Sequence, residues 1–81
     1  MKATVLIRPK DGILDPQGEA VGEALQHLGF AVSNARVGRL VDVQIDTDDA
    51  AGARVALDRM SNELLANPLI ESFTIELEAA P

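Results

Sequence analysis

The order of hydrophobic patterns along the chain limits its fold more than any other feature of the sequence. Within 81 residues, four stretches carry the alternating or β-branched pattern of strands, and two carry apolar residues at helical spacing. Strands are expected at residues 2–8, 30–37, 40–46 and 70–77, and helices at residues 16–28 and between Thr47-Asp48-Asp49 and Asn67-Pro68. The sequence therefore predicts the order strand, helix, strand, strand, helix, strand.

Local signals mark the ends of these elements. Asp15 before Pro16 is typical of a helix start, because the carboxylate caps free N–H groups and proline fits the first helical position. Gly29 stands where a left-handed residue is expected to end that helix. Gly38 and Arg39 are expected to form the turn of a hairpin between the second and third strands.

This order predicts an α+β fold of the ferredoxin-like class, β-α-β-β-α-β, with both helices packed on one face of an antiparallel sheet. Residues 1–81 provide material for a single domain. In this topology the loop after the first strand, the hairpin and the loop before the last strand share one rim of the sheet. Four of the seven basic residues, Arg8, Lys10, Arg36 and Arg39, fall on that rim, which is the predicted docking surface for a partner.

The composition restricts the possible partners. Thirteen acidic and seven basic residues give a net charge of −6, which is the wrong sign for a protein that binds nucleic acid through its phosphates. Phe30 and Phe73 are the only aromatic residues, so we expect a thin aliphatic core and a homo-oligomer. Cysteine is absent, and no uncharged stretch is long enough to span a membrane. Met1-Lys2 leads directly into a strand pattern without the apolar region of a signal peptide, so a cytoplasmic location is the expectation.

Few residues in this chain suit catalysis or metal binding. His27 is the only histidine, and without a cysteine or a second histidine it cannot complete a zinc or iron site. Asp11 and Asp15 are better explained as a turn residue and a helix cap than as a carboxylate pair. Arg8 would suit an acylphosphatase, but the third strand lacks the asparagine that this class uses. A small ligand-sensing, ACT-like dimeric module, with Gly12 in its first loop, is the alternative.

Four motifs carry a resemblance to a known family. They are residues 9–18 (PKDGILDPQG), 28–30 (LGF), 35–39 (ARVGR) and 64–71 (LLANPLIE). In this order, and over nearly the whole chain, they resemble the PurS family, the small subunit of phosphoribosylformylglycinamidine (FGAM) synthase. Arg39 stands where the family often carries lysine, which keeps the charge but changes the geometry of the contacts that the side chain can make.

The resemblance implies a non-catalytic subunit of an ATP- and glutamine-dependent ligase of purine biosynthesis. In the family, the large subunit PurL carries the chemistry of ATP, Mg²⁺ and substrate, and the glutaminase subunit PurQ releases ammonia. PurS assists their assembly and the ammonia transfer. The chain alone would bind no cofactor and would form a dimer or a dimer of dimers. The rim residues expected to take part in docking are Arg8, Pro9, Lys10, Gly12, Asp15, Arg36, Gly38, Arg39, Asn67 and Pro68.

Overall fold

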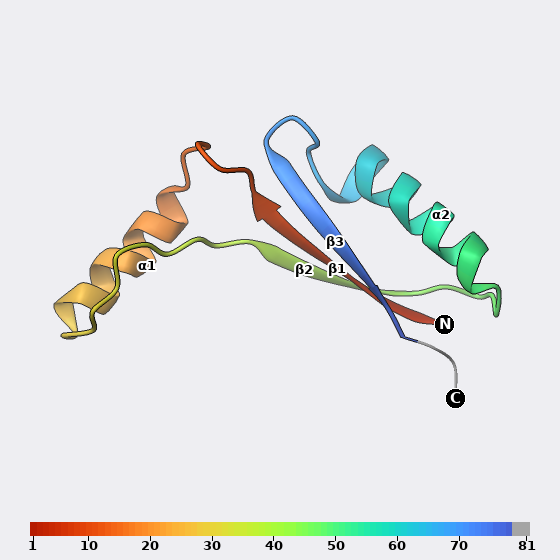
Figure 1. The fold of residues 1–81 in the computed structure, drawn as a ribbon, viewed down its shortest axis with the longest axis horizontal. Coiled ribbons are helices and arrows are strands. Elements are labelled where there is room, and N and C mark those ends of the chain that lie inside the picture. Colours follow the sequence, from red (N-terminus) through yellow and green to blue (C-terminus); the bar gives the residue numbers. More distant parts are fainter. Residues whose placement is uncertain (79–81) are drawn as a thin grey trace.

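The computed structural model, which describes residues 1–78, alternates strands and helices along the chain (Figure 1). The elements are β1 (Lys2–Pro9), α1 (Pro16–His27), β2 (Arg39–Gln44), α2 (Ala50–Met60), the π-helical turn η1 (Ser61–Leu65) and β3 (Glu71–Leu77). No helix within residues 1–78 is long and apolar enough to cross a membrane.

The sheet has β1 at its centre, in the order β2-β1-β3, and β1 runs antiparallel to both neighbours. Val5 lies opposite Val41 on one side and Ile75 on the other, so the apolar side chains of the three strands gather on one face. We call this the inner face and the opposite one the outer face. The predicted ferredoxin-like α+β class is confirmed.

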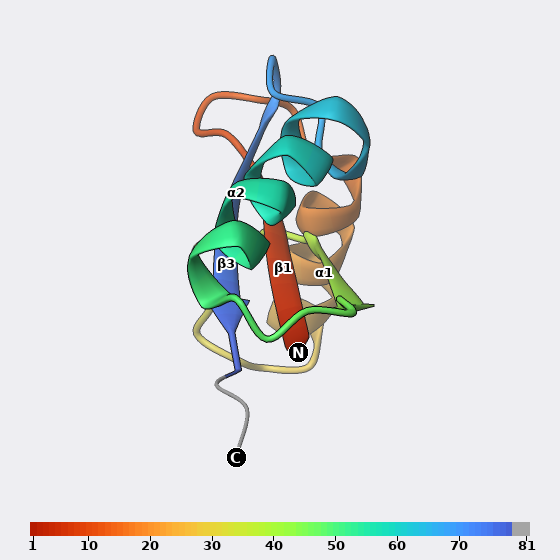
Figure 2. The ribbon, with the colours of Figure 1, turned by 90° about the vertical axis from the view of Figure 1, so that its right-hand side faces the viewer.

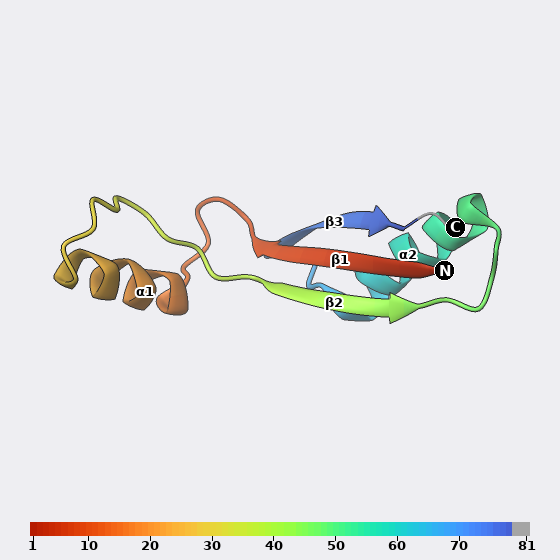
Figure 3. The same cartoon turned by 90° about the horizontal axis from the view of Figure 1, so that it is seen from below.

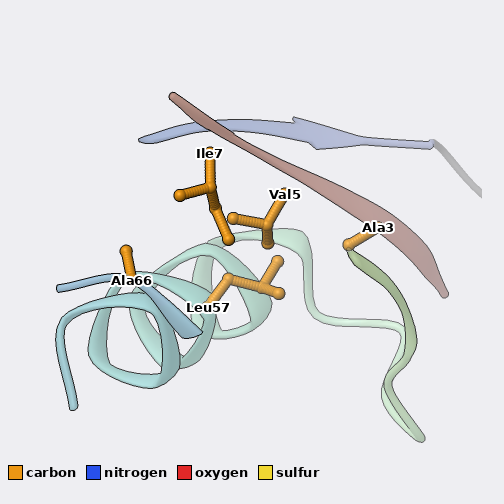
Figure 4. Close-up of a cluster of buried hydrophobic side chains, with 5 residues drawn as sticks. All are labelled: Ala3, Val5, Ile7, Leu57 and Ala66. Atoms are coloured by element: carbon orange, nitrogen blue, oxygen red, sulfur yellow. The ribbon is translucent and has the colours of Figure 1, made fainter. Parts of the chain in front are cut away.

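Helix α2 covers the inner face, as Figure 2 shows. Its Leu57 is fully buried and packs with Val5 and Ile7 of β1, which are also almost fully buried (Figure 4). Ala3 and Ala66 complete this cluster. The core is aliphatic and small, as the composition predicted, because a single helix covers three strands.

The prediction for residues 30–37 was wrong, because this segment forms no strand and no hairpin with β2. Helix α1 points away from the sheet, and the chain must run back along it to reach β2 (Figures 1 and 3). The segment therefore cannot lie beside β2, and the sheet of the described chain has three strands rather than four. For the same reason, only α2 packs on the inner face, and the expected packing of both helices there does not occur.

Close contact with the returning segment explains the glycines of α1. A side-chain carbon at Gly18 would lie 2.5 Å from the Ala35 carbonyl oxygen, and Gly22 faces the Ala35 side chain. Both glycines are buried, so α1 and residues 30–38 form one arm. Gly29 has φ +94°, which confirms the left-handed end predicted for this helix.

The second predicted helix is divided in the structure. Helix α2 ends at Met60 and continues as η1, where buried Ser61 donates its hydroxyl to the Leu57 carbonyl oxygen at 2.8 Å. At its start, Asp49 occupies the N-cap position, but its side chain makes no capping hydrogen bond. The Thr47 hydroxyl oxygen instead accepts from the Asp49 N–H.

Candidate functional site

Three segments that are far apart in the sequence meet at one end of the sheet. They are the loop at residues 10–15, the segment at residues 36–39 and the turn at residues 67–70, which we call the rim. Lys10 joins the first and the last, because its N–H donates to the Ile70 carbonyl oxygen at 2.8 Å and its Nζ donates to the Pro68 carbonyl oxygen at 2.7 Å. These two bonds fix the spacing between the two loops.

Arg36 joins the middle segment to the first loop. Its Nη2 donates to the carbonyl oxygens of Pro9 at 3.2 Å and Lys10 at 2.8 Å. Its Nε lies 3.7 Å from the Asp15 carboxylate. Two backbone acceptors and one carboxylate thus hold the guanidinium in place.

Asp15 connects the helix start to the middle segment. One carboxylate oxygen accepts from the Gly18 N–H at 3.0 Å, which confirms the predicted cap, and the other accepts from the Val37 N–H at 2.9 Å. The side chain is only 11% exposed. These two backbone hydrogen bonds, Val37 first, and then the charge of Arg36 lower the pKa of Asp15.

Arg39 and Glu71 form the third link of the rim. Arg39 donates from both terminal nitrogens to the Glu71 carboxylate and also to the Leu65 carbonyl oxygen. Glu71 in turn accepts from the Asn67 N–H at 2.8 Å. The hydrogen bonds from Arg39 and then from Asn67 lower the pKa of Glu71, and the carboxylate raises the pKa of Arg39.

Acid should weaken the fold through these two carboxylates. The folded state lowers the pKa of Asp15 and Glu71, so both carboxylates stabilise the fold at a pH above their unfolded pKa of about 4. This stabilisation is lost as the pH falls through their lower folded pKa values. We expect the melting temperature, measured by circular dichroism, to decrease as the pH is lowered from about 5 to about 2. The double variant Asp15→Asn with Glu71→Gln should melt lower at pH 7 and depend less on pH in that range. An equally steep acid slope in the variant would contradict this assignment.

The structure thus brings the predicted rim residues together, but it gives most of them internal contacts. Lys10, Arg36 and Arg39 are cross-links rather than free charges, whereas the Arg8 side chain has no hydrogen bond or ion pair with any of residues 1–78. Sequence reasoning could place these bases on one rim but could not see the carbonyl oxygens beside them.

The remaining predicted residues shape the backbone of the rim. Gly12 has φ +83°, which favours glycine, and Gly38 lies so close to the Ile7 carbonyl oxygen that a side-chain carbon would overlap it. Pro9 and Pro68 supply carbonyl acceptors for Arg36 and Lys10, as described above. Asn67 orders its own turn, because its side-chain oxygen accepts from the Leu69 N–H at 3.1 Å.

Sequence reasoning missed the exposed apolar residues of the rim. Leu14 is 74% exposed, Leu69 83% and Ile70 41%. Leu14 and Ile70 line a shared hollow of about 250 Å³ between the two loops. The available signal was that these loops carry apolar residues at positions where polar residues are more usual.

This arrangement is suited to binding a protein surface. Every buried side-chain nitrogen or oxygen of residues 1–78 has a partner, and no group of three or more acidic or histidine side chains there is placed to hold a metal ion. Exposed apolar side chains on ordered loops with polar surroundings are typical of surfaces that bind other proteins. The fold and the rim define a small α+β protein with three loop segments cross-linked at one end of its sheet.

Comparisons with known proteins identify the family. The model of the PurS family, phosphoribosylformylglycinamidine (FGAM) synthase, matches residues 2–79. The FGAM synthase subunit PurS of Synechocystis is 41% identical over 93% of this chain and 74% of its own length. A crystal structure of PurS from Methanocaldococcus jannaschii, one of the subunits of formylglycinamide ribonucleotide amidotransferase, is 32% identical. It superimposes with a TM-score of 0.85 over 99% of this chain and 98% of its own.

A chain in the structure of PurLQS from Thermotoga maritima has the same fold. Its TM-score is 0.85, at 22% identity over 93% of each chain. The chain described here belongs to the PurS family of FGAM synthase.

Proposed function

We propose that this chain is the small, non-catalytic subunit of FGAM synthase and that its rim docks the large synthetase subunit. The family assignment, the description of the M. jannaschii relative as one subunit of the amidotransferase and the PurLQS structure support this proposal. In the complex, ATP and Mg²⁺ would bind to the large subunit PurL, and the chain would help ammonia pass from the glutaminase PurQ. A cytoplasmic location belongs to the same proposal, because ATP and glutamine are metabolites of that compartment.

The observation that carries the proposal is the internal cross-linking of the rim. Lys10, Arg36 and Arg39 satisfy backbone carbonyl oxygens in three segments, so the rim is ordered before any partner arrives. A preordered surface loses little conformational entropy on binding. A subunit that contributes assembly rather than chemistry needs such a surface.

The chain also leaves apolar surface that a second copy would cover. Its radius of gyration is 15.9 Å, whereas a compact domain of this length has about 12 Å. On the arm, Val21, Leu28 and Phe30 are 43%, 74% and 59% exposed. We therefore expect sedimentation at about 10 μM to give at least a dimer, because this apolar surface favours association. A monomer at that concentration would contradict the expectation.

Reconstitution tests the proposed function directly. The purified chain is mixed with PurL and PurQ, and co-elution and the glutamine-dependent formation of FGAM are measured. We expect a stable complex whose synthetase activity requires the chain, and no turnover of glutamine or ATP by the chain alone.

A further inference from the structure

The outer face of the sheet has a second hollow at its rim end. It measures about 530 Å³ and lies where Leu6 of β1 pairs with Leu40 of β2. Arg8, Arg36 and Arg39 also line it, and no carboxylate does. Because Arg36 and Arg39 are paired with Asp15 and Glu71, Arg8 is the one lining charge without an ion-pair partner among residues 1–78.

The three arginines of this hollow differ in whether their side chains already have hydrogen-bond partners. Arg36 and Arg39 are held by carbonyl oxygens and are paired with Asp15 and Glu71, so they shape the wall of the hollow but their charges are already balanced. Arg8 is exposed, and its guanidinium keeps all its donors free of hydrogen bonds to residues 1–78. Arginine suits a carboxylate partner because its planar donors can form two parallel hydrogen bonds.

The apolar part of the lining restricts the occupant further. Leu40 is 55% exposed, and Gly38 brings the neighbouring backbone directly against β1. A free phosphate would leave this apolar part uncovered. We propose that the hollow receives an acidic and apolar segment of the large subunit, with Arg8 binding one of its carboxylates. This inference rests on the proposed function and assigns a particular part of the rim to that contact.

A second copy of this chain fits the hollow less well. Of the acidic residues on its sheet, Glu71 is paired with Arg39, whereas Asp42 and Glu76, together with Glu78 just after β3, line a hollow of about 670 Å³ at the opposite end. Two concave surfaces do not fill each other, whereas a protruding segment of another protein can enter one of them.

The test compares two charge reversals on the same strand and face. Arg8→Glu places a negative charge in the hollow, and Lys2→Glu makes the same change at the far end of β1. Affinity for purified PurL is measured by titration calorimetry at two salt concentrations, with the melting temperature and homo-oligomer mass of each variant. We expect Arg8→Glu to weaken binding by roughly tenfold or more, and Lys2→Glu to change it less than about threefold. Both variants should keep their mass, and Arg8→Glu should keep its melting temperature, whereas Lys2→Glu should melt slightly lower because it adds a negative charge beside Asp42, Glu76 and Glu78.

Each other outcome has a distinct meaning. If the wild-type chain does not bind PurL, the proposed function itself fails. If it binds and both reversals weaken binding equally, or neither does, the hollow is not the contact. A changed homo-oligomer mass in Arg8→Glu would assign the hollow to a second copy. Arg8-dependent binding of inorganic phosphate by the isolated chain would assign it to a small anion. Either result would overturn the inference.

Discussion

Replacing Leu57 by alanine should destabilise the fold by about 2–5 kcal/mol. Leu57 is fully buried and is the largest side chain that α2 places against Val5 and Ile7. A domain of this size has a total stability of about 5–15 kcal/mol, so this loss is a large share of it. The melting temperature should fall by roughly 10 °C or more.

Val55→Ala is the matched control for this change. Val55 lies on the same helix but is 65% exposed, so its truncation should cost less than about 0.5 kcal/mol. Circular dichroism is the suitable readout, because the chain has no tryptophan or tyrosine. Similar melting temperatures for the two variants would contradict the packing of α2 on the sheet.

Local chemistry in the sequence predicted most of the elements correctly. Asp15-Pro16 marks the start of α1 and Gly29 marks its end. Both signals were readable because capping and left-handed geometry depend on neighbouring residues alone. The apolar alternation of the last strand was equally informative, since β3 buries one face. The fold class was predicted correctly from the order of these elements, although that order included a strand at residues 30–37 that the structure does not form.

The failures share a physical cause, which is that they depend on distant partners. Residues 30–37 have strand-like residues, but the direction of α1 carries them away from β2. Arg36 and Arg39 were identified as rim residues, yet their acceptors, among them the carbonyl oxygens of Lys10 and Leu65, are backbone atoms that no sequence pattern marks. The exposure of Leu69 likewise depends on how its turn is held.

The double variant Leu14→Asp with Leu69→Asp should abolish docking to PurL. These leucines are 74% and 83% exposed on loops that Lys10 fixes, so replacing them by charged residues should affect a partner more than the fold. Burying a leucine contributes about 1.5–3 kcal/mol, and two such contacts correspond to a loss of affinity of at least roughly 100-fold. Val55→Asp, on the exposed side of α2, introduces the same chemistry away from the rim and should leave docking unchanged.

The glutamine-dependent synthetase rate of the reconstituted complex tests the central claim most directly. The rate is measured with PurL and PurQ alone, with the wild-type chain, with the Leu14→Asp and Leu69→Asp double variant, and with Val55→Asp. We predict activity with the wild-type chain and with Val55→Asp, and little without the chain or with the double variant, whose homo-oligomer mass should be unchanged. Full activity without the chain, or with the double variant, would contradict the account.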